Sequence, residues 1–126
     1  MRRLTSAHAV AAFFLGAGVL HFVKPRPYEA IVPPALPRAR ELVYATGVAE
    51  ILGAVGVVPE RSRLWAGWWL LGLLLAVFPA NVYHALAADE IPGQLVPRPL
   101  LWLRLPLQGV MMWWVWRATQ PGAVPS

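Results

Sequence analysis

The hydrophobic residues of the chain fall into four long runs, at residues 4–23, 41–58, 64–88 and 100–116. Each run is close to the length, about 20 residues, that crosses a bilayer as a helix. Polar residues gather between the runs and do not recur at the spacing of an amphipathic surface helix. We therefore predict an all-α fold, an integral membrane four-helix bundle that forms a single transmembrane domain over residues 1–126.

The segments between the runs are rich in proline and arginine. Residues 24–40 contain five prolines, which exclude a continuous helix, and residues 89–99 form a second loop with Pro and Gly. Residues 59–63 are short enough to form only a turn between antiparallel neighbours. Both Pro-rich loops then lie on one face of the bundle. The apolar centre of the first loop, residues 30–36, is interpreted either as a cap over the mouth of the bundle or as a linker in the headgroup region.

Composition supports a membrane location. The chain is 58% hydrophobic and 13% charged, with a mean hydropathy of +0.53, which is unusual for a soluble domain. The net charge of +5 comes from arginines at the ends of the runs, so it indicates contact with membrane lipid and disfavours a nucleic-acid partner. The absence of cysteine excludes disulfides and thiolate metal sites. The three histidines lie at different depths, so no metal site is predicted.

Tryptophans give a check on the arrangement of the four spans. In an alternating bundle, the start of the third span and the end of the fourth lie on one face, where six of the seven tryptophans gather. These are Trp65, Trp68, Trp69, Trp113, Trp114 and Trp116. Such an aromatic belt predicts that both termini lie on the same side. The arginine pair at the amino terminus favours the cytoplasmic side.

Glu50 is the main candidate for chemistry, because it is an acidic residue near the middle of the second run. An acidic side chain at that depth costs at least about 2.5 kcal/mol unless it is protonated, paired or turned inward. We expect it to form a hydrogen bond with Asn81, to pair with Arg104, or to be protonated. The Asn81 contact is favoured, because Arg104 is long enough to extend to the headgroups.

Several other polar side chains lie at a similar depth or nearer the loop face, given a rise of about 1.5 Å per residue along each helix. They predict one pocket that opens toward the two Pro-rich loops and has His21 and Glu50 as candidate catalytic groups. The predicted ligand-binding residues are His21, Tyr44, Glu50, Asn81, Arg104 and Gln108. The alternative is that these residues are structural, with His21 satisfied by water at the interface and Asn81 joining helices.

Three stretches resemble a known family: GVLHFVKPRPYEAIVPPALP, LVYATGVAEILGAVGVVP and VFPANVYHAL. They are similar to the small four-helix DoxX-like membrane proteins of bacteria. The matching positions are His21, Phe22, Glu50, Phe78, Pro79, Ala80 and Asn81. The resemblance implies a bacterial inner-membrane bundle with cytoplasmic termini. It also implies either a redox partner, like the subunit associated with thiosulfate:quinone oxidoreductase, or a chaperone-like protein, as in the distant NACHO-type relatives.

Two functions follow as hypotheses. The first is a non-enzymatic membrane module that binds a membrane protein, a second copy of itself or a lipid-like ligand in a polar pocket, and needs no cofactor. The alternative is a membrane subunit of a quinone-linked oxidoreductase, in which Glu50 and His21 handle protons. A transporter is disfavoured, because a single short unit lacks an inverted repeat.

Overall fold

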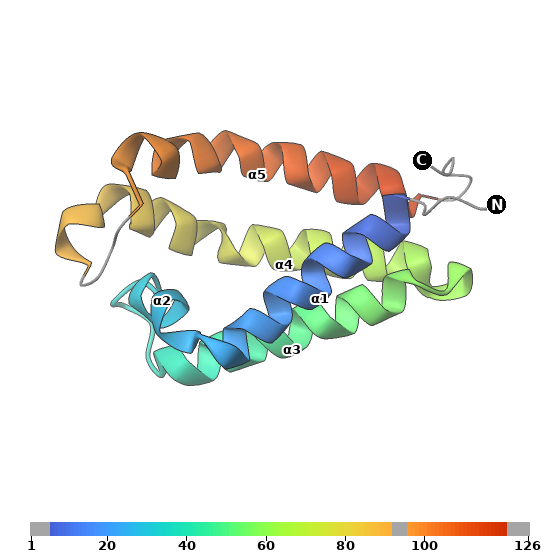
Figure 1. Ribbon diagram of the computed structural model, residues 1–126, viewed down its shortest axis with the longest axis horizontal. Helices are drawn as coiled ribbons and strands as arrows, with labels where there is room; N and C mark the ends of the chain where they lie inside the picture. Colours follow the sequence, from blue (N-terminus) through green and yellow to red (C-terminus); the bar gives the residue numbers. More distant parts are fainter. Residues whose placement is uncertain (1–5, 92–95, 121–126) are drawn as a thin grey trace.

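The computed structural model describes residues 6–91 and 96–120, and this part of the chain is helical, without strands (Figure 1). The helices are α1 (Ser6–Val23), α2 (Pro25–Ala30), α3 (Ala39–Val57), α4 (Glu60–Leu86) and α5 (Arg98–Thr119), with a short 3-10 helix, η1 (Ala88–Glu90). The all-α prediction is confirmed. The four hydrophobic runs correspond to α1, α3, α4 and α5, and residues 4–5 of the first run lie outside the described part.

All three predicted connections differ from the structure. The expected turn at residues 59–63 is shorter, because extended backbone at Pro59 (φ −72, ψ 136) lets α4 begin at Glu60. The expected loop at residues 24–40 contains α2, since Pro25 stands at a first helical position that needs no N–H donor. In the second loop, η1 was not expected, and residues 92–95 lie outside the described part.

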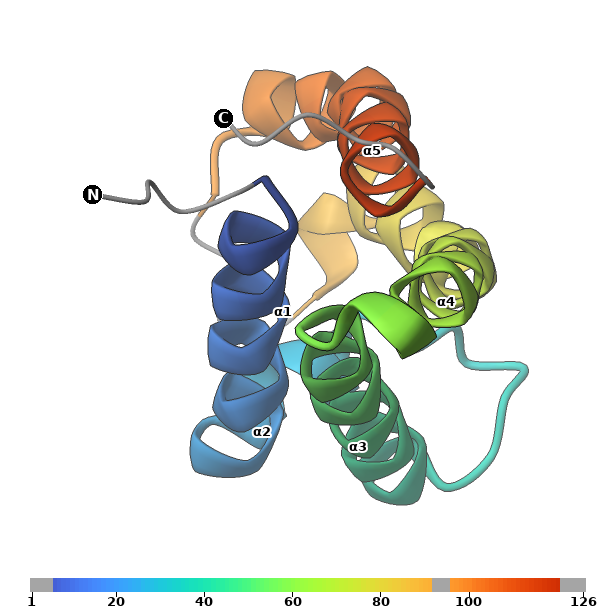
Figure 2. The same cartoon turned by 90° about the vertical axis from the view of Figure 1, so that its right-hand side faces the viewer.

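The four long helices alternate in direction (Figure 1). The start of α1, the α3–α4 connection and the end of α5 lie at one end of the bundle, called here the terminal end. The other end, called the cap end, carries α2 and the end of α4. The end-on view shows α1 beside α3 and α4 beside α5 (Figure 2). Phe13 of α1 and Trp114 of α5 meet edge to face, with ring centroids 6.1 Å apart.

Apolar packing is concentrated at the terminal end. All four long helices contribute to one core cluster, formed by Ala7, Val10, Ala11, Phe14, Ala54, Val57, Ala66, Leu70, Leu74, Val115 and Ala118. Toward the cap end, a smaller cluster of Ala85, Ala88 and Leu101 joins only the α4–η1 segment to α5. The two apolar clusters therefore leave the interior between the α1–α3 pair and the α4–α5 pair without an apolar core at this end.

Two glycines bring α1 and α3 into close contact. A Cβ atom at Gly47 would lie 2.8 Å from the His21 Cβ and 3.0 Å from the Gly18 carbonyl oxygen. A Cβ atom at Gly18 would lie 2.9 Å from the Gly47 carbonyl oxygen. Only glycine permits this backbone approach, as in other tightly packed helix pairs.

The predicted tryptophan cluster lies at the terminal end. Trp65, Trp68 and Trp69 of α4 and Trp113 and Trp116 of α5 are exposed, with Trp65 73% exposed. Trp114 is the half-buried member of this group and contacts Phe13. The two tryptophan groups coincide because α4 and α5 are antiparallel neighbours.

Among the described helices, α4 is the one that is long and apolar enough to cross a membrane by length and composition alone. Residues Ala7–Val23 of α1 form a shorter apolar helix. Arg40, Glu41 and Glu50 lower the hydropathy of α3, and Arg104 and Gln108 lower that of α5. The described fold thus establishes a helical bundle with one helix of membrane-spanning character.

We predict that Gly47→Ala lowers the melting temperature, because the added methyl group forces α1 away from α3, and such overpacking costs about 1 to 3 kcal/mol. Gly16→Ala is the matched control, since nothing lies within 4 Å of its added Cβ. It should be neutral or stabilising by up to about 1 kcal/mol through helix propensity. Equal melting temperatures for the two variants would contradict the close contact.

Candidate functional site

A cavity of about 360 Å³ occupies the interior toward the cap end. Its walls combine apolar side chains, including Phe14, Leu74, Val77 and Met111, with polar side chains from α1, α3, α4 and α5. The polar groups are Thr46, His21, Glu50, Asn81, His84 and Arg104. The cavity therefore lies where the apolar core ends and the two helix pairs separate.

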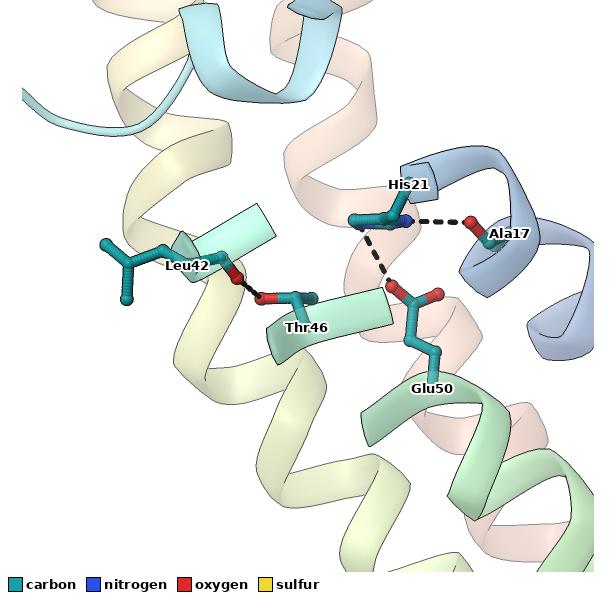
Figure 3. A network of polar contacts seen from close by, with 5 residues as sticks. All are labelled: Ala17, His21, Leu42, Thr46 and Glu50. Carbon is teal, nitrogen blue, oxygen red and sulfur yellow. Dashed lines mark hydrogen bonds and ion pairs between the residues drawn. The ribbon is translucent and has the colours of Figure 1, made fainter. Parts of the chain in front are cut away.

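The first polar wall is a contact between His21 of α1 and Glu50 of α3 (Figure 3). His21 Nε2 and Glu50 Oε2 are 3.2 Å apart, and both side chains are nearly buried. In an antiparallel pair, each Cα–Cβ bond tilts toward the start of its own helix, so the two side chains lean toward each other. The close approach at Gly18 and Gly47 brings their backbones within reach.

The hydrogen bonds of His21 fix where its protons lie. His21 Nδ1 is 2.7 Å from the carbonyl oxygen of Ala17. A carbonyl oxygen only accepts, so Nδ1 carries a proton and donates. One further proton is needed between Nε2 and Glu50, either on the carboxyl group or on the imidazole. In both arrangements the His21–Glu50 pair has no net charge.

Helix α2 covers this pair from the cap end. The ring of Tyr28 stacks on the ring of His21, with centroids 3.8 Å apart. Burial raises the pKa of the Tyr28 phenol, so it stays protonated at neutral pH. Arg40 Nε donates to Glu29 Oε2 at 2.7 Å and ties α2 to the start of α3. Tyr28, Ile31 and Val32 line the cavity, so this segment forms a cap, while Leu36, at the far end of the predicted apolar centre, is exposed.

The second polar wall joins α4 to α5. Arg104 donates through Nη2 to Asn81 Oδ1, and Asn81 Nδ2 donates to Gln108 Oε1 at 2.6 Å. Gln108 Nε2 then donates to the Leu74 carbonyl oxygen at 2.7 Å. Pro79 has no N–H to donate to the carbonyl oxygen one turn earlier in α4, next to the Leu74 carbonyl that accepts from Gln108 of α5. This chain of bonds fixes the orientation of each amide.

His84 accepts a hydrogen bond from the same arginine. Arg104 Nη1 and His84 Nδ1 are 3.3 Å apart, and a guanidinium only donates, so this ring nitrogen is unprotonated. The guanidinium thus points into the bundle and contacts neutral groups. The three salt bridges among the described residues are His21–Glu50, Arg40–Glu29 and Arg98–Asp89, so Arg104 has no carboxylate partner there.

Several predictions about the site need correction. Glu50 contacts His21 instead of Asn81 or Arg104, because helix α3 packs directly on α1 at that level. Arg104 does not extend to the headgroups but turns inward to Asn81. Asn81 does join helices, as the structural alternative proposed.

The six predicted ligand-binding residues divide into two groups. His21, Glu50, Asn81 and Arg104 line the cavity. Gln108 is buried behind Asn81, and Tyr44 stacks on Phe22 at the edge of the α1–α3 contact, with centroids 5.2 Å apart. Neither of these two residues is among those that line the cavity.

Three polar lining residues, Tyr28, Thr46 and His84, were absent from the predicted set. Leu70, Leu74, Val77, Asn81 and His84 recur at helical spacing in the sequence, and the structure shows His84 buried on the face that this spacing defines. Tyr28 was missed because its segment was interpreted as a loop. The aromatic residue after Pro27, next to the apolar cap, was the available signal. Within residues 6–91 and 96–120, no cluster of three or more His, Cys, Asp or Glu suits a metal ion.

Comparison with known families covers most of the chain. A family model described as "Domain of unknown function (DUF8561)" matches residues 10–119. The chain belongs to the DUF8561 family. Neither the curated proteins nor the solved structures contain a match.

The DUF8561 match corrects the resemblance to the DoxX-like proteins, which is wrong. The expectations that rested on that resemblance lose this support: a bacterial inner-membrane location, a thiosulfate:quinone oxidoreductase partner and a chaperone-like role. Glu50, Asn81 and their neighbours are therefore interpreted from the geometry of this DUF8561 chain alone.

We predict that Glu50 and His21 are energetically coupled. In a double-mutant cycle, Glu50→Ala and His21→Ala should destabilise the protein by less together than the sum of the single losses, by about 0.5 to 3 kcal/mol. Melts of the purified protein provide the measurement. Glu50→Ala with Asn81→Ala is the matched pair, and its losses should add, since no hydrogen bond joins these residues. Coupling of Glu50 to Asn81 and not to His21 would contradict the observed pairing.

Proposed function

We propose that this DUF8561 protein is a membrane-embedded four-helix bundle that binds a lipid-like small molecule in the cavity beneath α2, as a non-enzymatic binding module. The observation that carries the proposal is the cavity itself, a mostly apolar space with a few polar side chains in its wall, inside a bundle whose outer surface is apolar. We further propose multiple membrane crossings with both termini on the cytoplasmic side.

The outer surface supports the membrane environment. Each of the four long helices exposes large apolar side chains, for example Val23 at 65%, Val55 at 60%, Leu75 at 64% and Val110 at 58%. Exposed apolar area on this scale marks contact with lipid or with another protein. Meanwhile His21, Glu50, His84 and Gln108 are buried. A water-soluble bundle places such groups the other way round.

The positions of the charges agree with this environment. The charged residues of the four long helices lie in their first or last turns, with the exceptions of Glu50 and Arg104. Both exceptions line the interior cavity. The middle of the outer surface is thus apolar, and the exposed tryptophans at the terminal end match an interfacial belt.

The cavity has the properties of a small-molecule site. Its volume is within the range of about 300 to 1,000 Å³ that such sites have. Phe14, Leu74, Val77 and Met111 offer an apolar lining, while the two polar walls hold fixed donors. A molecule with an apolar body and one polar end satisfies both parts of this lining.

A second candidate is proton transfer to a redox-active ligand such as a quinone. The proton shared by His21 and Glu50 lies at the cavity wall, where it can reach a ligand oxygen. Identification of the bound molecule distinguishes the two candidates, because a quinone in the purified protein would favour the redox role.

We predict that reporter fusions truncated after Arg61 and placed at the C-terminus report one compartment. A fusion truncated after Leu36 should report the other, because Leu36 lies toward the cap end between α2 and α3. The measurement is paired alkaline phosphatase and fluorescent-protein activity. Opposite compartments for the first two fusions would end the four-span arrangement.

We predict that the purified protein retains a lipid-like molecule of defined mass, and that Ala80→Phe removes it by filling the cavity. Ala76→Phe is the matched control, one turn earlier on α4, because Ala76 is exposed and lies outside the cavity lining. Mass spectrometry of organic extracts, normalised to protein, provides the measurement. Identical extracts from both variants and the parent would contradict a ligand in this cavity.

A further inference from the structure

We propose that the ligand carries a single acidic headgroup, such as a carboxylate, and that Arg104 binds it while the apolar lining holds its tail. This inference rests on the proposed ligand-binding function and names the chemical class of the ligand. It follows from the balance of charge in the cavity and from the fixed geometry of one side chain.

The charges that line the cavity do not cancel. The His21–Glu50 pair shares one proton and contributes no net charge, as the hydrogen bond to Ala17 requires. Tyr28 is a neutral phenol, and His84 presents an unprotonated nitrogen to Arg104. Arginine keeps its proton in proteins, so the cavity carries one positive charge without a carboxylate partner among the described residues.

Arg104 is held in a position to receive an anion. Asn81 and His84, both on α4, accept from its two terminal nitrogens, and these are two of its five N–H donors. Asn81 is fixed in turn by Gln108, which is bonded to the Leu74 carbonyl oxygen. The guanidinium is therefore oriented before any ligand arrives, and its remaining donors suit the paired oxygens of a carboxylate.

The rest of the cavity determines what accompanies the acidic group. Phe14, Leu73, Val77 and Met111 line it with apolar surface, and Ile31 and Val32 of the cap segment add to it. A small hydrophilic anion leaves this surface without a partner. An acid with an aliphatic tail covers it, so the site favours a fatty-acid-like amphiphile over a free anion.

The test compares four labelled probes on the full-length protein in nanodiscs, with empty nanodiscs subtracted. Laurate, lauryl alcohol and laurylamine share one tail and differ in headgroup, and acetate carries the headgroup without the tail. Laurate should bind roughly tenfold to a hundredfold more tightly than lauryl alcohol, because its carboxylate adds a negative charge and a second acceptor oxygen opposite the guanidinium. Laurylamine should bind most weakly of the three amphiphiles, and acetate should show no saturable binding.

Arg104→Gln should abolish the preference for laurate over lauryl alcohol, while Arg104→Lys should retain part of the preference. Arg98→Gln is the matched control on the same helix, since Arg98 pairs with Asp89 and does not line the cavity, and it should bind as the parent does. Equal binding of the three amphiphiles, or a preference that survives Arg104→Gln in a folded protein, overturns the acidic-headgroup inference alone. Absence of saturable binding by all four probes overturns the proposed function as well. Saturable binding of acetate overturns the requirement for an apolar tail and points to a free anion.

Discussion

The contact between α1 and α3 at Gly18 and Gly47 is the constraint on which the rest of the interior depends. Because neither residue has a side chain, the two backbones approach closely enough for His21 to reach Glu50. The stacked rings of Phe22 and Tyr44 pack at the edge of the same contact. The core cluster of the terminal end then has no counterpart between the two helix pairs, and the cavity lies in that place.

The two polar walls solve the problem of buried polar groups in different ways. His21 and Glu50 satisfy each other through one proton, so they need no ligand to be tolerated in an apolar bundle. Arg104 is satisfied as a hydrogen-bond donor by Asn81 and His84, but these acceptors are neutral and leave its charge uncompensated. The first wall of the cavity is therefore neutral by itself, whereas the second carries a positive charge that complements an anion.

Predictions from the sequence succeeded where a single helix decides the outcome. The lengths of the hydrophobic runs located the four long helices to within a few residues, and the tryptophan groups indicated that α4 and α5 are antiparallel. The helical spacing from Leu70 to His84 in the sequence coincides with the inward face of α4. The cost of an exposed acid in an apolar helix likewise required Glu50 to turn inward, and it is buried.

The sequence by itself therefore determined that Glu50 and one face of α4 turn inward, because periodicity and the cost of desolvation act along one helix. Only the tertiary structure decided which of these residues meet. Depth along the helices favoured Asn81 over His21 as the partner of Glu50, but the choice depended on which helix lies beside α3. The role of Tyr28 also required the path of the chain through α2, since proline spacing indicates where a helix is interrupted but not where the next short helix packs.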